Sequence, residues 1–452
     1  MKKNDILDVY IDEVEIPNKG LAKVGDNRII VKDAIKGQKV KIRITKKRKD
    51  KIEGKVLEVL EKSPIEKEPF CRHFGACGGC SYQTLSYEEQ LNIKSNQVTK
   101  LLRDAGIKDF EYLGIEPSPL EYDYRNKMEF TFGDVEKGGE LSLGLHQKGK
   151  FYEIVTVEGC QIVDSDFIKI LTNTLDYFRE KGVELYNKRS HKGVLRHLVV
   201  RKAIKTGELL VNLVTTSQQQ LKLDELIERL KDIEYRGRLV GFLHTVNDNF
   251  SDTVQSDETK ILFGRDYIVE EILGLKFKIS AFSFFQTNTL GAEKLYSIVR
   301  DFAGDKKDKL IYDLYCGTGT IAQIMATVAR KVVGIEIVEE AVESAEENAK
   351  LNGLDNCHFI AGDVMEKVSE LNEKPDLIIL DPPRDGIHPK AIQKIIDFEP
   401  EEFIYVSCNP KSLARDLPVF EERGYKVQKV KCMDMFPHTP HTECVTICRK
   451  IE

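Results

Sequence analysis

The sequence lacks the features of a membrane-spanning or exported protein. No apolar run approaches the roughly 20 residues that a membrane-spanning helix needs. The N-terminal stretch MKKNDILDVYIDEVE carries acidic residues where a signal peptide needs an apolar segment. Ten cysteines without a secretory signal argue against a disulfide scaffold and favour metal-binding or catalytic thiols. We therefore expect a cytoplasmic protein with no membrane segment, and its 452 residues suggest roughly two to four domains.

Basic and acidic residues are unevenly distributed along the chain. The formal net charge is −6, but residues 19–51 contain thirteen Lys or Arg against three Asp, a local excess of +10. Within residues 39–51, apolar and basic residues alternate before a KKRKDK stretch, which is typical of a small antiparallel β-barrel with a basic loop. A solvated hairpin tip is the alternative, but so basic a patch on an acidic chain favours contact with a nucleic-acid backbone. The sequence thus predicts a β-barrel domain over residues 1–62 that binds nucleic acid.

Three closely spaced cysteines follow the basic segment. Cys71, Cys77 and Cys80 stand in a Gly-rich loop with C-x5-C-x2-C spacing, and Cys160 is available as a fourth thiolate. Zinc accepts thiolates, but zinc sites more often contain two C-x2-C pairs. An iron–sulfur cluster commonly takes three cysteines from one loop and one from a distant segment. The pattern favours a closed, non-radical cluster over zinc and over free structural cysteines.

The region from Ser81 to about residue 280 is less informative and contains no repeat or low-complexity tract. Helical periodicity is found near residues 167–181 and 221–230, between strand-like runs. This alternation predicts a central α+β domain over residues 63–275 that carries the cluster. Several basic residues near its strand edges either contact RNA or only decorate the sheet, namely Arg125, Lys127, Arg196 and Arg201.

The C-terminal part contains five apolar strands that each end in a polar residue. Helical segments separate the strands, which recur about every 25 residues, so we expect a doubly wound, mostly parallel sheet with ligands at the carboxyl strand ends. The strand-end residues are Asp313, Glu336, Asp363, Asp381 and Ser407. The turn DLYCGTG lacks both the third glycine of G-x-G-x-x-G and a P-loop lysine, so S-adenosylmethionine is favoured over a dinucleotide or nucleoside triphosphate. This Rossmann-like domain is expected over residues 276–452, with Glu336 at the ribose hydroxyls.

Two further residues suggest covalent chemistry. Cys408 follows the fifth strand in SCNP, where its thiol would face the ligand cleft and the following helix start would lower its pKa. Glu443 opens a final strand in the HTEC element. A cysteine nucleophile, a glutamate base and a methyl donor together suit the alkylation of an unreactive pyrimidine carbon.

The order of these motifs resembles that of the TrmA/RumA family of RNA uracil-C5 methyltransferases, over nearly the whole chain. The matching elements are FFQTN with Gln286, DLYCGTGT, GIE, DPPR, SCNP and HTEC. The resemblance is greatest to the RumA-like enzymes of 23S ribosomal RNA. It implies a TRAM-like N-terminal barrel and a four-iron, four-sulfur cluster held by Cys71, Cys77, Cys80 and Cys160.

The resemblance also implies a role for each site residue. Cys408 would add to carbon 6 of the uracil, and Glu443 would remove the carbon-5 proton. Arg384 would orient the uracil together with Asp381, and further RNA contacts are expected from Arg125 and Lys127. The expected contacts to S-adenosylmethionine are Gln286, Tyr315, Glu336, Asp363 and Asp381.

The RNA target is inferred from the domains alone. TrmA-type transfer-RNA enzymes generally lack both the barrel and the cluster, so the resemblance favours 23S ribosomal RNA over transfer RNA. A non-catalytic RNA-binding or assembly factor on the same fold is the alternative outside the enzyme class, and the presence of both Cys408 and Glu443 argues against it. We expect a monomer whose partner is RNA and that does not bind a membrane.

Overall fold

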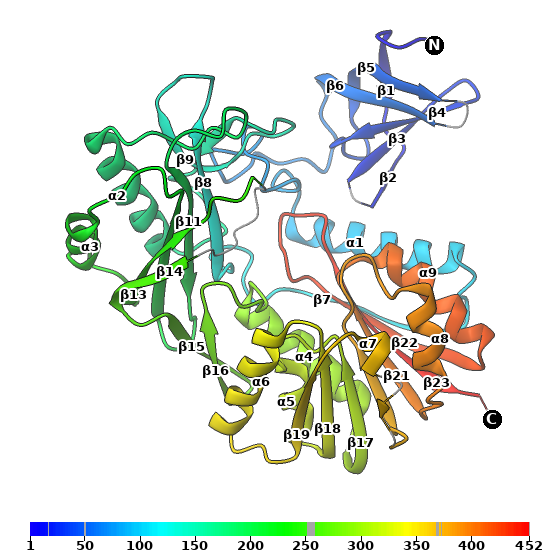
Figure 1. Ribbon diagram of the computed structural model, residues 1–452. Helices are drawn as coiled ribbons and strands as arrows, with labels where there is room; N and C mark the ends of the chain where they lie inside the picture. Colours follow the sequence, from blue (N-terminus) through cyan, green and yellow to red (C-terminus); the bar gives the residue numbers. More distant parts are fainter. Residues whose placement is uncertain (17, 49–50, 251–257, 368–369, 372, 452) are drawn as a thin grey trace.

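The computed structural model describes residues 1–16, 18–48, 51–250, 258–367, 370–371 and 373–451. Within these ranges the strands form a six-stranded, a seven-stranded, a two-stranded and an eight-stranded sheet. Figure 1 shows the six-stranded sheet at the N-terminal end, the seven-stranded sheet beside it and the eight-stranded sheet below both. None of the helices in the described ranges is long and apolar enough to cross a membrane.

The N-terminal sheet curls around a small apolar core. Along its long strand β5, Val40, Ile42 and Ile44 are fully buried, while the Lys and Arg residues between them lie on the other face. The curl brings β1 close to β3, although these two strands are not hydrogen-bonded neighbours. The predicted basic tip includes Lys49 and Asp50, which lie outside the described residues. In spatial order the strands are β1 (Ile6–Tyr10), β5 (Lys39–Arg48), β6 (Lys51–Glu61), β4 (Asn27–Lys32), β3 (Lys19–Val24) and β2 (Glu13–Glu15).

The central sheet packs against two helices, α2 (Ser165–Lys181) and α3 (Asp224–Lys231). Its two middle strands, β11 and β12, are buried at every position, as expected for strands covered on both faces. In spatial order its strands are β10 (Ile154–Thr156), β9 (Leu141–His146), β8 (Lys127–Asp134), β11 (Leu195–Lys202), β12 (Glu208–Thr215), β13 (Arg238–Val246) and β14 (Glu258–Gly264). A hairpin of β15 (Tyr267–Ile272) and β16 (Leu275–Ser280) leads to the last sheet.

The eight-stranded sheet is the doubly wound, mostly parallel sheet that the sequence predicts. Five parallel strands are followed by β23, which is antiparallel to both of its neighbours. In spatial order the strands are β19 (Cys357–Ala361), β18 (Ala329–Glu336), β17 (Lys306–Leu314), β20 (Leu377–Leu380), β21 (Glu402–Ser407), β23 (Glu443–Lys450), β22 (Tyr425–Met433) and β7 (Glu111–Glu116).

Helices cover both faces of this sheet. One face packs against α4 (Thr289–Ala303), α5 (Thr320–Ala326) and α6 (Glu339–Leu351). The other face packs against α1 (Tyr87–Asp104), α8 (Pro389–Ile396) and α9 (Pro410–Glu422), and the short helix α7 (Val364–Lys367) follows β19.

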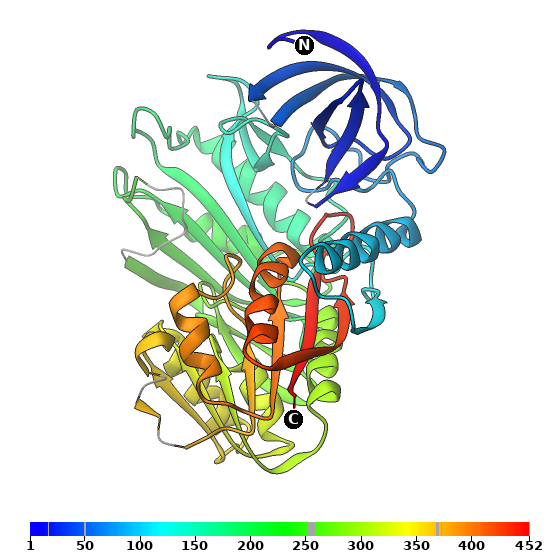
Figure 2. The same cartoon turned by 90° about the vertical axis from the view of Figure 1, so that its right-hand side faces the viewer.

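The segment that contains α1 and β7 differs from the expectation. The sequence assigns it to the central domain of residues 63–275, but Val98 and Leu102 of α1 are buried in the core of the C-terminal sheet. β7 pairs in parallel with β22 and forms the edge of that sheet. Figures 1 and 2 show α1 between the N-terminal and C-terminal sheets. The Gln97 amide of α1 also donates to the Val14 carbonyl of β2 over 3.0 Å, so this helix links both units.

Candidate active site

The turn after β17 packs its backbone tightly against β19. Tyr315, Gly317 and Gly319 have positive φ angles of 66°, 53° and 71°. A Cβ atom at Gly319 would lie 2.5 Å from the Phe359 ring, so only glycine fits there. Tyr315 adopts a left-handed conformation that is costly for a residue with a bulky side chain, and such residues cluster at functional sites. The predicted cofactor turn is therefore a closely packed, strained element at the carboxyl ends of the strands.

Two of the predicted cofactor residues stand beside this turn. One Glu336 carboxylate oxygen accepts a hydrogen bond from the Gly317 N–H over 3.0 Å. The other oxygen accepts from the backbone N–H groups of Ile337 and Val338, which follow Glu336. Asp363 caps α7, and its charge, after the larger effect of burial, raises the pKa of the Tyr315 phenol to about 12. The structure thus brings Tyr315, Glu336 and Asp363 together at neighbouring strand ends.

Asp313, which the sequence analysis used only to mark a strand end, lies beneath the same turn. Its side chain is fully buried, and within the described part of the chain neither carboxylate oxygen makes a hydrogen bond of regular geometry, although the Ala322 N–H of α5 is near enough to lower its pKa. Burial, followed by the charges of Asp381 and Glu336, raises its pKa well above the usual value. A buried acceptor without a donor is costly, so this position suits a ligand that supplies N–H groups or positive charge. The amino group of S-adenosylmethionine meets that requirement.

Cys408 lies between the end of β21 and the start of α9. The Asn409 side chain caps the helix by accepting from the Lys411 N–H over 3.2 Å, which fixes the chain immediately after the cysteine. The expected lowering of the thiol pKa by the helix start is wrong. Burial, followed by the charges of Glu443 and Asp381, raises the pKa of Cys408 to about 11, while the Arg384 charge and a hydrogen bond from the backbone N–H of Cys408 itself lower it.

The strand register brings Glu443 next to Cys408. β23 lies between β21 and β22, with Cys444 paired opposite Ser407 at the end of β21, so Cys408, immediately beyond that end, lies next to Glu443, whose charge acts on its thiol. Burial and the Asp381 charge raise the pKa of Glu443 to about 8, and burial raises that of Asp381 to about 7. A nucleophile and two carboxyl groups that each favour the neutral form therefore share one buried site.

The predicted substrate residues differ in their position relative to this site. The Arg384 guanidinium lies 3.3 Å from Nδ1 of His441, and its backbone carbonyl accepts from Asn409 over 2.9 Å. Burial, followed by the charges of Arg384, Lys94 and Arg125, lowers the pKa of His441 to about 4. The Arg125 charge thus acts on His441, while its Nε–H donates to the Lys127 carbonyl over 2.9 Å.

Lys127 is engaged elsewhere. Its ammonium pairs with Glu129 of the same strand over 2.5 Å, and burial lowers its pKa. The structure places Arg384 at the site next to His441, leaves Arg125 with an effect of its charge on His441, and directs Lys127 along β8.

Gln286 is buried in a segment that the central unit holds in place. The Asn126 side chain donates to the Gln286 carbonyl over 3.0 Å and to the Thr289 hydroxyl over 2.8 Å. Arg201 donates to the carbonyls of Ala281 and Ser283 in the same segment. Asn126 and Arg201 are therefore positioning residues, and the sequence gives no sign of these long-range partners.

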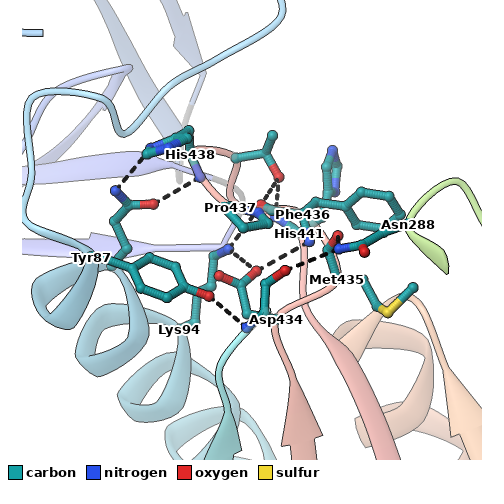
Figure 3. Close-up of polar contacts among 12 residues, drawn as sticks. Tyr87, Lys94, Asn288, Asp434, Met435, Phe436, Pro437, His438 and His441 are labelled. Carbon is teal, nitrogen blue, oxygen red and sulfur yellow. Dashed lines mark hydrogen bonds and ion pairs between the residues drawn. The ribbon is translucent and has the colours of Figure 1, made fainter. Parts of the chain in front are cut away.

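Figure 3 shows the loop that precedes Glu443 resting on α1. Lys94 of α1 pairs with Asp434 over 2.6 Å, with both side chains fully buried, and also donates to the Phe436 carbonyl. Gln90 accepts from the His438 N–H over 2.8 Å, and its amide lies 3.1 Å from Nδ1 of His438. These contacts fix the loop that carries His441 and leads into Glu443.

Replacing Lys94 by methionine is expected to destabilise the protein by about 3–5 kcal/mol, because the Asp434 carboxylate would remain buried without its partner. Thermal unfolding of the purified variant measures the loss. The double variant Lys94→Met/Asp434→Leu removes both charges and should regain most of the stability. Equal melting temperatures for wild type and Lys94→Met would contradict this role of the ion pair.

The four predicted cluster cysteines line one cavity. Cys71, Cys77, Cys80 and Cys160 surround it together with apolar side chains that include Phe74, Leu145 and Ile162. The Gly79 N–H donates to the Cys77 sulfur over 3.3 Å, and the Gln83 amide donates to the Cys80 sulfur over 3.5 Å. Within the described ranges, no group of three or more His, Cys, Asp or Glu side chains is placed to hold a single metal ion. The thiols thus share a cavity without forming a mononuclear site.

Comparisons with known proteins agree with this architecture. The family model described as tRNA (uracil-5-)-methyltransferase matches residues 86–451. An uncharacterized RNA methyltransferase of Caldanaerobacter subterraneus is 56% identical over 100% of both chains, and one of Bacteroides thetaiotaomicron is 37% identical over 95% of this chain and 98% of its own.

A solved structure extends the similarity to the N-terminal sheet. The tRNA (uracil-54, C5)-methyltransferase of Pyrococcus abyssi, in complex with S-adenosyl-L-homocysteine, is 25% identical with a TM-score of 0.76. The match covers 98% of this chain and 100% of the Pyrococcus chain. By the extent of these matches, the chain belongs to the family of S-adenosylmethionine-dependent RNA uracil-5-methyltransferases.

Proposed function

We propose that the protein methylates carbon 5 of a specific uridine in 23S ribosomal RNA through a covalent cysteine–uracil intermediate. The observation that carries the proposal is the adjacency of Cys408 and Glu443 across β21 and β23, next to Asp381 and Arg384. A nucleophile and a base for carbon-5 chemistry are both required, and the strand order supplies both at the ligand-binding edge of the sheet.

Cys408 performs the first step by adding its sulfur to carbon 6 of the uracil. A carbon–sulfur bond forms, the 5,6 double bond breaks, and the electron pair moves into an enolate. Bound S-adenosylmethionine supplies the methyl group that carbon 5 then takes up. Glu443 accepts the carbon-5 proton, the double bond re-forms, and the Cys408 thiolate is expelled.

The surrounding charges explain how Cys408 is activated. With a pKa near 11 the thiol holds its proton at neutral pH, so addition needs a proton acceptor. Asp381, with a pKa of about 7, is the carboxyl group at hand for this proton, because Glu443, with a pKa of about 8, must keep its carboxylate free for the carbon-5 proton. Arg384 favours the thiolate by its charge and stands where it can hold the developing enolate.

We assign the cofactor pocket to the carboxyl ends of β17 and β18, beside the Gly-containing turn. Gln286, Tyr315, Glu336, Asp363 and Asp381 are proposed to bind S-adenosylmethionine. To this set we add Asp313, because its buried and unpartnered carboxyl group suits the positively charged amino group.

A four-iron, four-sulfur cluster is proposed at Cys71, Cys77, Cys80 and Cys160. Each thiolate of such a cluster binds a different iron, so its ligands stand farther apart than those of a single ion, in line with four thiols around one cavity. The N–H donors to sulfur and the apolar lining are those that iron–sulfur sites use. All four ligand positions are thiolates and the reaction transfers no electron, so the cluster is structural.

The cluster predicts that anaerobically purified protein contains iron and sulfide and absorbs visible light. Cys80→Ser should lose most of the iron, because the partly buried Cys80 lines the cavity and supplies one of its four thiols. Cys448→Ser, a buried cysteine of β23, is the matched control and should keep it. Zinc in place of iron, or no metal in wild type, would overturn the assignment.

Transfer RNA is the second candidate target. The Pyrococcus abyssi structure, named for uracil 54 of transfer RNA, matches 98% of this chain and therefore includes the N-terminal sheet. The presence of that sheet alone does not separate the two targets, and the four cysteines are the remaining support for ribosomal RNA. The N-terminal sheet, a TRAM-like unit in this proposal, binds RNA through its basic face.

Mass spectrometry of nucleosides tests the proposal. Large-subunit ribosomal RNA and transfer RNA are incubated separately with anaerobically purified protein and S-adenosylmethionine. 5-Methyluridine in the ribosomal RNA alone is the expected result, and oligonucleotide mapping then locates the site or sites. 5-Methyluridine in transfer RNA alone would show that transfer RNA, and not ribosomal RNA, is the substrate. Absence of 5-methyluridine from both RNAs would favour a non-catalytic RNA-binding factor.

A further inference from the structure

Two loops of the central unit, together with Phe250 from the segment after β13, gather exposed rings and cations on one surface. We name it the cation–aromatic surface and define it as Phe151, Tyr152, Lys188, Arg189, His191 and Phe250. The Lys188 ammonium lies 5.1 Å from the centre of the Phe151 ring, and the Arg189 guanidinium lies 4.4 Å from the centre of the Tyr152 ring. The His191 and Phe250 rings are 4.4 Å apart, and those of Phe151 and Tyr152 are 5.1 Å apart.

The rings on this surface are unusually exposed. The exposed fractions of Phe151, Tyr152 and Phe250 are 60%, 46% and 77%. Single exposed apolar residues are common, but a contiguous group of aromatic rings in water indicates an interaction site. Lys188 and Arg189 lie over these rings, so the surface presents aromatic rings and cationic groups side by side.

The backbone of the second loop is held in a defined shape. The Asn187 side chain accepts from the N–H groups of Arg189 and Ser190 over 2.9 and 3.0 Å. The Tyr186 hydroxyl lies 2.9 Å from Nδ1 of His191. The loop tip that carries Lys188 and Arg189 is therefore preorganised in the free protein, which reduces the entropic cost of binding.

The charge of both loops is of one sign. Residues 146–152 (HQKGKFY) and 186–192 (YNKRSHK) together contain five Lys or Arg and no Asp or Glu. Lys150 pairs with Glu153, and Lys148 lies 3.7 Å from Asp33 of the N-terminal sheet. The surface thus combines a positive potential with stacking groups, and it adjoins the basic N-terminal unit.

The cysteine loop connects this surface to the active site. On one side, the Gly78 N–H donates to the His146 carbonyl over 2.9 Å, and the Lys148 N–H donates to the Ala76 carbonyl over 2.7 Å. On the other side, the N–H groups of Ser81 and Tyr82 both donate to the His438 carbonyl, over 2.8 and 3.0 Å. One short segment therefore separates the cation–aromatic surface from the loop that leads to Glu443.

We propose that the cation–aromatic surface binds unpaired bases of the substrate RNA that flank the target uridine. Bases stack on aromatic rings and on guanidinium planes regardless of sequence, and the adjacent cations neutralise the backbone. A uridine that leaves its stack to enter the pocket also unpairs its neighbours, which then need new stacking partners. The proposal rests on the proposed function, because it specifies which part of the RNA the enzyme holds.

The test compares two fluorescein-labelled RNAs of equal length: a stem-loop with unpaired nucleotides around a uridine, and a fully paired duplex. The double variant Phe151→Ala/Tyr152→Ala should bind the stem-loop about 10- to 100-fold more weakly, given the stacking energy of one to two bases, and the duplex as wild type does. Phe151→Tyr keeps the ring and should keep the affinity. Leu351→Ala removes an equally exposed side chain at the end of α6 and is the matched control.

Binding is read without turnover, so the result stands even if methylation fails. In the methylation assay, the double variant should raise KM for the RNA while kcat at saturating RNA stays unchanged. Equal weakening for stem-loop and duplex would show that the loops act on the backbone alone and would overturn the proposal. Unchanged stem-loop affinity would also overturn it.

Discussion

Cys408→Ala is expected to reduce methylation below detection, because no other group in the site can form the bond to carbon 6. The affinity for S-adenosylmethionine should remain near that of wild type, since the cofactor turn lies at β17 and β18, on the other side of β20. Incorporation of labelled methyl groups into RNA and calorimetric binding of the cofactor measure the two quantities separately.

The control for this variant is a second buried cysteine of the same sheet. Cys448 lies on β23 away from the site, so Cys448→Ala should cost stability but leave methylation intact. Methylation by Cys408→Ala at a rate within tenfold of wild type would sink the covalent mechanism. Loss of cofactor binding in Cys408→Ala would instead show that the variant is misfolded at the site.

Glu443→Gln is expected to lower turnover by about 10²–10⁴-fold, the usual contribution of a general base. The methylated adduct should accumulate, because Cys408 still adds to the uracil but the carbon-5 proton is no longer removed. A protein–RNA band that survives denaturing gel electrophoresis detects this adduct. Absence of the band, with turnover equally reduced, would assign the base to another residue.

The pH dependence gives a second measurement on the same residue. The pKa of Glu443 is raised, so its carboxylate, the form that accepts a proton, becomes abundant only as the pH rises through about 8. Single-turnover rates of wild type should therefore increase across that range, and this increase should be missing in Glu443→Gln. Glu422→Gln, an exposed glutamate of α9, should retain the wild-type profile.

The sequence predicts the parts of the fold that depend on local pattern. The five parallel strands and the helices α2 and α3 lie where periodicity and strand-end residues place them. The Gly-x-Gly turn is found as expected because its positive φ angles restrict the residue types that can occupy it. The motif order also identifies the family, which the matches over nearly the whole chain confirm.

Features that depend on partners far apart in the sequence could not be predicted. Arg196 and Arg201 were candidates for RNA contact, yet each donates to backbone carbonyls of its own chain, those of Arg196 at Asn247 and Asn249. The pKa of Cys408 was expected to fall, but burial of the thiol, followed by the charges of Glu443 and Asp381 from other strands, raises it. Local pattern cannot show either kind of neighbour, because strand order decides which side chains meet.

The position of β7 decides whether the C-terminal domain could be separated from the rest of the chain and fused to other RNA-binding domains. Its edge strand and the helix α1 that covers one face come from a segment upstream of every strand of the central sheet. Residues 276–452 on their own would expose the edge of β22 and the apolar surface that α1 covers, and this exposure would favour aggregation. The methyltransferase domain therefore cannot be transferred to another protein without α1 and β7. RNA-binding parts can be exchanged around it only by changes that leave the tether of α1 and β7 intact.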